Sequence, residues 1–192
     1  SGSLGETCED AVVAYCYSSF EDDPEACLDY DRYFVACGYN QLSTSGAAAL
    51  RRGVTEGRSG LGVVYVFAAG NEYSSGDDVN YEGYLNSRFT ISVGAVGKDL
   101  RHASYSSVGA AVTVSAPGGD ADSVHNMVTA FPLSSGRADD CGDATIGTSF
   151  ATPLVSGAVA LILEANPALG WRDVQGIFAA TAARVDSDDE DW

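Results

Sequence analysis

Hydrophobic residues form three short runs along the chain, each followed by turn-forming residues. The runs are GVVYVFAAGN (62–71), FTISVGAV (89–96) and AAVTVSAPG (110–118). Each run is rich in β-branched residues and too short for a typical helix, so each predicts a strand. The first run has almost no polar residue, which is typical of a strand covered on both faces in a parallel sheet.

Three further segments have the pattern of helices. Residues 43–57 contain an alanine run that Ser43 or Ser45 can cap at its start and that Gly57 can end. A long apolar run after Ser149 predicts a buried, rigid helix, and residues 171–185 predict an amphipathic one. The stretch from 118 to about 146 is expected to be a loop. Helices alternating with strands predict a layered α/β domain with a mostly parallel sheet between helices.

The length and composition suit one domain. The chain has 192 residues, of which 45% are hydrophobic and 22 are glycine. Residues 6–42 are acidic, tyrosine-rich and cysteine-bearing, and we interpret them as a surface insertion in a domain over 1–185. Residues 186–192 (DSDDEDW) are interpreted as a solvated acidic tail. We judge every apolar run too short or too interrupted to span a bilayer.

The charge balance narrows the set of ligands. The formal net charge is -17, from 27 acidic and 10 basic residues. Nucleic acids and anionic membranes are disfavoured, since phosphate contacts need clustered lysine and arginine. A cationic substrate or a metal ion would be attracted.

The five cysteines are unevenly placed: Cys8, Cys16, Cys27, Cys37 and Cys141. The first four do not have the spacing of zinc ligands. We expect them to form two local disulfides in an oxidising compartment, with all three connectivities open. The alternative is reduced structural thiols.

A candidate nucleophile lies in the segment GTSFATP (147–153). A serine at a helix start is ordinarily an N-cap. Here Gly147 and Ala151 leave space around the hydroxyl of Ser149, and the free N–H groups of the following helix would face a negative charge that develops beside it. That arrangement suits acyl transfer. Ala151 replaces the second glycine of G-x-S-x-G, which weakens an esterase of the α/β-hydrolase type as an alternative.

Two motifs together resemble the subtilisin-like serine proteases, the subtilase family. They are GTSFATPLVSGAVALIL from Gly147 onward and AAGN (68–71) after the first predicted strand. The resemblance implies a three-layer α/β fold and peptide-bond hydrolysis through an acyl-enzyme on Ser149. It also implies that the amide of Asn71 donates to the oxyanion. An ordinary turn asparagine is the alternative for Asn71.

Residues 53–71, 80–96 and 163–175 narrow the resemblance to the kexin and furin branch. That branch cuts after basic residues, with an acidic side chain at the position of Glu82. An ordinary surface acid is the alternative. The resemblance further implies a set of backbone positions that bind substrate: Ser3, Leu4, Gly5, Ala69 and Gly70.

The same resemblance implies a structural calcium ion bound by Asp77. Ser107 replaces the matching second carboxylate, which weakens this site because calcium takes six or more oxygen ligands. Val79 and Gly109 replace a cysteine pair of animal relatives. Cys141 matches a cysteine that bonds to one in the N-terminal half of the family's catalytic domain.

The sequence lacks the motifs that carry the aspartate and histidine of the family's catalytic triad. Neither the family's D-S/T-G segment nor its H-G-T segment occurs, and we expect His102 and His125 to be exposed loop residues. We therefore expect the C-terminal portion of a catalytic domain, without its N-terminal part and inactive alone. Its implied partners are polypeptides with basic residues and the missing N-terminal half, in the secretory lumen or outside the cell. A catalytically inactive subtilase-fold binding or scaffold module is the alternative.

Overall fold

The fold was analysed in a computed structural model, which describes residues 40–121, 126–130 and 141–185. Most of the predicted insertion at 6–42 and the predicted tail at 186–192 lie outside the described residues. The helices and strands in chain order are α3 (Thr44–Glu56), β1 (Tyr65–Ala68), β2 (Thr90–Val96), β3 (Val112–Pro117), β4 (Met127–Ala130), β5 (Cys141–Thr145), α4 (Thr148–Ala165) and α5 (Trp171–Thr181).

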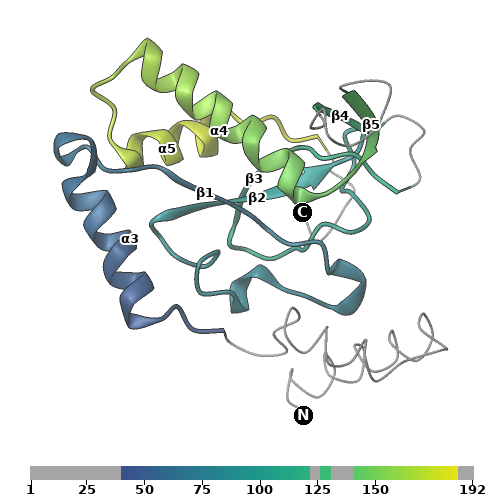
Figure 1. The fold of residues 1–192 in the computed structure, drawn as a ribbon, viewed down its shortest axis with the longest axis horizontal. Coiled ribbons are helices and arrows are strands. Elements are labelled where there is room, and N and C mark those ends of the chain that lie inside the picture. The colour runs from purple at the N-terminus through teal and green to yellow at the C-terminus, as the bar shows by residue number, and fades with distance from the viewer. Residues whose placement is uncertain (1–39, 122–125, 131–140, 186–192) are drawn as a thin grey trace.

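The three predicted strands form one parallel sheet in the order β1-β2-β3 (Figure 1). Tyr65 pairs with Thr90 at the start of β1, and Val93 pairs with Val114 across the β2–β3 ladder. All of β2 is buried, as expected for a central strand. β1 is only partly buried. Among the described residues β2 is its one strand neighbour, so β1 is an edge strand there, which accounts for its partial exposure.

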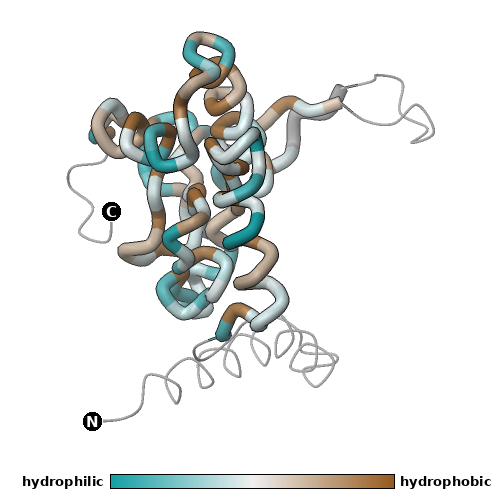
Figure 2. The backbone as a smooth tube through the Cα atoms, turned by 90° about the vertical axis from the view of Figure 1, so that its left-hand side faces the viewer, coloured by the Kyte–Doolittle hydropathy of each residue, from teal (hydrophilic) through white to brown (hydrophobic). Residues whose placement is uncertain are grey.

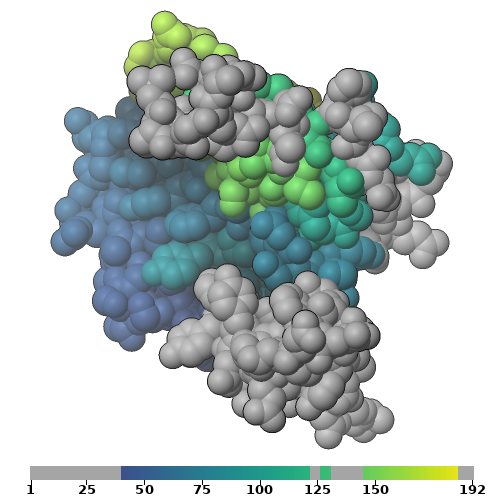
Figure 3. All heavy atoms as spheres, turned by 45° about the vertical axis from the view of Figure 1, so that its right-hand side comes forward, coloured from purple at the N-terminus to yellow at the C-terminus, as the bar shows by residue number. Residues whose placement is uncertain are grey.

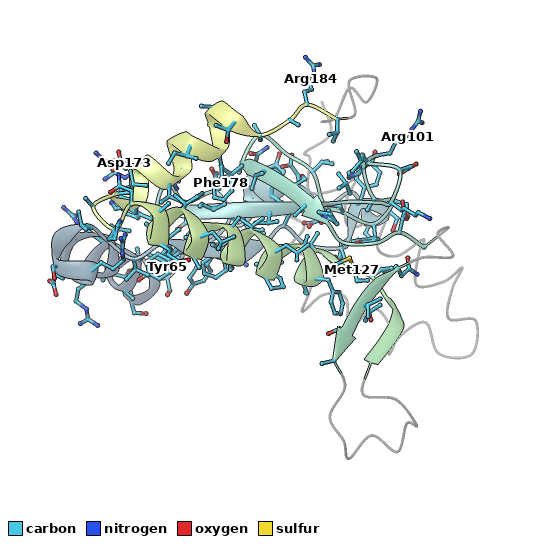
Figure 4. The ribbon with its side chains drawn as sticks, turned by 90° about the horizontal axis from the view of Figure 1, so that it is seen from above. Tyr65, Arg101, Met127, Asp173, Phe178 and Arg184 are labelled. Carbon is cyan, nitrogen blue, oxygen red and sulfur yellow. The ribbon has the colours of Figure 1, made fainter. Side chains whose placement is uncertain are left out.

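The core lies where the sheet meets the two C-terminal helices. Ile91, Val93 and Ala95 of β2 pack with residues of α4 and with Val174 of α5. Figure 4 shows the strands running between α4 and α5, with Phe178 on the side of α5 that faces the sheet. In Figure 2 the hydrophobic segments pass through the middle of the molecule and hydrophilic turns flank them. This is the α/β architecture that the sequence predicted.

The helix α4 departs from its expected burial. Ala151, Val155 and Val159 are buried against the sheet, but Leu161 is 67% exposed and Leu154 is 45% exposed. Among the described residues, α4 alone has the length and hydropathy of a membrane span, with a mean hydropathy of 1.4. The judgement that no apolar run was long enough was therefore wrong. Because α4 packs against all three strands, it is here a core helix with one apolar face uncovered by the described residues.

Two smaller predictions had different outcomes. Ser43, rather than Ser45, caps α3, because its side chain accepts the N–H of Gly46, and α3 ends before Gly57 as predicted. The expected loop before α4 instead contains an antiparallel pair, β4 and β5. Their strands are four and five residues long, and the second (CGDAT) has no hydrophobic alternation that would have predicted it.

Candidate active site

The chain leaves β1 through a tight turn that carries Asn71. Ala69 is buried, and its N–H donates to the carbonyl of Val93 at 2.9 Å. Gly70 has a φ of +114°, and a Cβ there would lie 2.7 Å from Ser107 Oγ. Glycine is therefore needed at this position, since a side chain would be both strained and crowded. The turn brings Asn71 to the surface at the carboxyl end of the sheet, where it is exposed.

The start of α4 places Ser149 in the first helical turn. The N-cap is Gly147, with a φ of +142°, so the ordinary interpretation of Ser149 as the N-cap is wrong. Ser149 is exposed, whereas the preceding Thr148 is fully buried. In Figure 3 the start of α4 lies at the surface beside the segment that follows β1. A nucleophile must be accessible to substrate, and Ser149 meets that requirement.

Thr148 connects the two motifs. Its N–H and its hydroxyl both lie 2.9 Å from Asn71 Oδ1. Its Oγ1 also lies 3.2 Å from the carbonyl oxygen of Gly70. A backbone N–H can only donate, so the atom that faces the Thr148 N–H must be the carboxamide oxygen of Asn71. The amide nitrogen Nδ2 therefore points away from Thr148. The residue next to Ser149 therefore sets the orientation of the Asn71 side chain.

Two N–H donors remain available at this point. Within the described part of the chain, neither Asn71 Nδ2 nor the backbone N–H of Ser149 has an acceptor, whereas Phe150 N–H donates to the Gly147 carbonyl at 3.0 Å. The first turn of a helix also carries partial positive charge. A carbonyl oxygen that becomes anionic on attack by Ser149 would find both donors unoccupied.

Tyr105 holds the loop before Ser149. Its hydroxyl donates toward the carbonyls of Gly118 and Gly119, at 2.8 and 3.0 Å, and accepts the N–H of Gly147 at 2.8 Å. Burial raises the pKa of Tyr105 to about 12, although the hydrogen bond from Gly147 N–H acts in the opposite direction. The hydroxyl therefore stays protonated and ties the end of β3 to the N-cap of α4.

We expect Tyr105→Phe to lower the free energy of unfolding by about 1–2 kcal/mol, because it removes the hydroxyl that bonds the carbonyl of buried Gly119. Gly147 N–H and Gly118 O would still bond each other at 3.0 Å. Urea unfolding at unchanged m-value would measure this. Tyr84→Phe is the matched control, because Tyr84 is 43% exposed and its hydroxyl makes no hydrogen bond in the described segments; there we expect a change below about 0.5 kcal/mol. Equal effects of the two variants would contradict the role given to Tyr105.

Ser107 anchors the turn below Asn71. It is fully buried, its N–H donates to Gly70 O at 3.1 Å, and its Oγ accepts Glu72 N–H at 3.2 Å. Its hydroxyl also donates a hydrogen bond to the Asp77 carboxylate. Burial raises the pKa of Asp77, and the hydrogen bond from Ser107 lowers it by a smaller amount. Glu72 Oε2 accepts the backbone N–H of Asn71 at 2.6 Å. Ser107, which stands where the resemblance implies a second calcium-binding carboxylate, thus stabilises the turn that carries Asn71.

The calcium ion expected at Asp77 stays a prediction. No group of three histidine, cysteine or acidic residues there could hold a metal ion. The Asp77 carboxylate already accepts the Ser107 hydroxyl. Calcium also takes oxygens of backbone carbonyls and water as ligands, so the acidic side chains alone do not decide the prediction.

Glu82 is partly buried and directly follows the short helical turn Val79–Tyr81. Its side chain accepts a hydrogen bond from Asn40 Nδ2 at 3.0 Å. Burial raises its pKa, the bond from Asn40 lowers it, and the charge of Asp77 raises it. Within the described residues, the carboxylate forms no ion pair with a lysine, arginine or histidine. It is therefore a partly buried carboxylate to which a cation could bind.

Other predicted residues lie elsewhere. Ser3, Leu4, Gly5, His125 and the first four cysteines fall outside the described residues, so the substrate strand and the disulfides stay predictions. Cys141 is the first residue of β5. His102 was expected to be exposed, and that was wrong: it is partly buried, its Nε2 lies 2.8 Å from Ser106 O, and its ring contacts Tyr73 edge-on.

Sequence reasoning missed Thr148 and Tyr105. Thr148 stands inside the GTS motif beside Ser149, and its place there was the available signal. Tyr105 is one tyrosine among 10, and no sequence pattern marks it. Its role depends on a contact with Gly147, 42 residues away.

Comparison with known proteins identifies the family. The model of the subtilase family matches residues 15–191. The chain is 39% identical over 148 residues to mouse proprotein convertase subtilisin/kexin type 7, and 40% identical over 146 residues to kexin of Saccharomyces cerevisiae. The protein belongs to the subtilase family of serine peptidases, and its relatives include kexin-like processing enzymes.

Solved structures share the fold. The serine protease of Aeromonas sobria superposes with a TM-score of 0.67 at 27% identity, over 79% of this chain and 32% of the protease. A protease of Pseudoalteromonas arctica gives 0.64 at 25% identity, over 80% of this chain and 44% of that one. The two curated relatives align over 77% and 75% of this chain, and over 19% and 17% of their own length. The chain therefore spans about a fifth of the curated relatives that it matches.

Proposed function

We propose that this chain carries the nucleophile and the oxyanion hole of a serine endopeptidase. Ser149 Oγ attacks the peptide carbonyl, and the amine leaves as the acyl-enzyme forms. Asn71 Nδ2 and the N–H of Ser149 stabilise the oxyanion. The pair of bonds from Thr148 to Asn71 Oδ1 carries this proposal, because it directs the free amide donor while leaving Ser149 exposed.

The proton of Ser149 needs a base, since a serine hydroxyl is a weak nucleophile without one. His102 is engaged with Ser106 and Tyr73. Neither His102 nor His125 lies in an H-G-T segment, so we assign the base and the carboxylate that orients it to polypeptide outside these 192 residues. The uncovered apolar face of α4, with Leu154 and Leu161, is the surface on which that polypeptide would pack.

The proposed substrates are polypeptides with a basic residue immediately before the cleaved bond. Glu82 is a partly buried carboxylate without a cationic partner among the described residues. An unpaired buried charge is costly, so a cationic side chain would be selected strongly. Similar relatives include a dibasic-processing endoprotease of Yarrowia lipolytica, 38% identical over 146 residues. Protein processing in the secretory pathway or outside the cell follows as part of the same proposal.

Calcium at Asp77 is retained as a proposal about the whole protein. Because calcium takes six or more oxygens, Asp77 would need further ligands beside it from other side chains, backbone carbonyls or water. Removing calcium with a chelator would then lower the melting temperature of the whole protein.

Labelling with a fluorophosphonate probe tests the proposed function. We expect the isolated 192-residue chain, with its fold checked by circular dichroism, to remain unlabelled because it lacks a base. The whole gene product should be labelled stoichiometrically at Ser149. Stoichiometric labelling of the isolated chain would show that the base lies within it. A folded whole protein without labelling would favour the inactive scaffold module instead.

A further inference from the structure

We infer that Asn40 is a positioning residue for Glu82: its side-chain amide holds the carboxylate in the orientation that faces a basic substrate side chain. The inference rests on the proposed function, since it concerns how the proposed specificity residue is held. It also gives a role to the point where the chain leaves the predicted insertion at 6–42.

Asn40 is attached to the Glu82 segment by its backbone as well as by its side chain. Its N–H donates to Tyr81 O at 2.7 Å, and its carbonyl accepts the N–H of Gly83 at 2.8 Å. The two bonds form a parallel bridge between Asn40 and Glu82. A Cβ on Gly83 would lie 2.7 Å from Asn40 O and would clash with the backbone N of Leu42. Glycine at 83 is what lets the two segments approach so closely.

The side chain of Glu82 depends on Asn40 for its orientation. The backbone of Glu82 is held independently, because its N–H donates to Val79 O at 3.2 Å and its carbonyl accepts Asn86 N–H at 2.7 Å. Its carboxylate has one hydrogen-bond partner in the described segments, Asn40 Nδ2, on Oε2. Oε1 has none there. A carboxylate fixed through one oxygen leaves the other available to a ligand.

The chemistry of the amide suits this role. A lysine or arginine at position 40 would neutralise Glu82 and compete with a basic substrate. An asparagine donates a hydrogen bond without cancelling the charge. It also counters the effects of burial and of Asp77, both of which favour the protonated form of Glu82. Asn40 therefore orients the carboxylate and favours its ionised form.

The experiment uses the whole gene product and two peptides that differ only by arginine or citrulline before the cleaved bond. Citrulline has nearly the shape of arginine but no charge. The readout is the ratio of the two kcat/KM values. We expect Glu82→Gln to abolish most of the discrimination. We expect Asn40→Ala to lower the ratio about 10-fold, through KM for the arginine peptide, because a charge-assisted hydrogen bond is lost.

A pH profile adds a readout that a merely structural role would not move. Without the hydrogen bond from Asn40, the pKa of Glu82 should rise further. As the pH is lowered, Glu82 should then be protonated earlier, and the preference for arginine should be lost at a higher pH than in the wild type. Asn40→Gln, which keeps the donor, should restore part of the ratio. Gln41→Ala is the matched control, because this exposed neighbouring amide makes no side-chain hydrogen bond in the described residues.

The outcomes separate the inference from the proposed function. If Glu82→Gln abolishes the discrimination but Asn40→Ala leaves the ratio and its pH profile unchanged, the inference is wrong and the basic preference stands. If Glu82→Gln leaves the ratio unchanged, the proposed specificity is wrong and the inference falls with it. In a protein without turnover, the carboxyl ¹³C titration of Glu82 still decides: an unchanged midpoint in Asn40→Ala overturns the inference, and a raised one supports it.

Discussion

Replacing Ser149 by alanine in the whole protein is expected to lower kcat by about 10⁶-fold, the loss typical when a nucleophile of this kind is removed. The physical reason is that the covalent route through the acyl-enzyme is closed, while substrate binding is retained. The exposed hydroxyl makes no hydrogen bond within the described part of the chain, so its removal should barely change stability. Turnover of an arginine peptide and a thermal melt would measure both effects.

Ser156→Ala is the matched control for this variant. Ser156 is also an exposed serine on α4, with its hydroxyl donating to Thr152 O at 3.1 Å, but it lies two helical turns further along. Its turnover should stay within about twofold of the wild type, as for most surface substitutions. If Ser149→Ala kept more than a few per cent of the activity, another residue would have to be the nucleophile.

Replacing Asn71 by aspartate is expected to lower kcat by at least about 10²–10³-fold, with little change in KM. Loss of one oxyanion donor typically costs that much. Aspartate keeps an oxygen for the bonds from Thr148 but turns the donor toward the oxyanion into a second, negatively charged oxygen. Kinetics with an arginine peptide would show the separation of kcat from KM.

Thr148→Ser tests whether the Asn71 effect concerns the donor itself. Serine keeps both the N–H and a hydroxyl for Asn71 Oδ1, so we expect turnover within about tenfold of the wild type. Asn71→Asp with wild-type kcat would show that the amide does not meet the oxyanion. A large loss in Thr148→Ser would instead show that the methyl group of Thr148, which is fully buried, positions the turn.

The sequence was informative where the signal is local. Strands such as β2 follow from a run of β-branched and small residues, and α3 follows from Ser43 at its cap. The Ser149 and Asn71 motifs could be recognised because each is contiguous in sequence. That the two belong together was an expectation from resemblance; the contact between them depends on Thr148, 77 residues from Asn71.

Local reasoning could not have found the contacts that support the site. Ser107 was interpreted as a lost ligand, yet its burial below Gly70 makes it an anchor of the turn. Asn40 had no visible role until the structure placed it beside Glu82, 42 residues away. His102 was wrongly expected at the surface, because neither its contact with Tyr73 nor its bond to Ser106 follows from the pattern of a polar loop.

One helix both packs against the sheet and begins with the reacting group, and this limits how the protein can be engineered. A substitution at Val155 or Val159 that alters the packing of α4 would also tilt its first turn and displace Ser149. Heat tolerance and reactivity would then change together. Attempts to stabilise the protein should therefore start from α3, whose buried residues Leu50 and Val54 are not part of the core cluster that α4 joins.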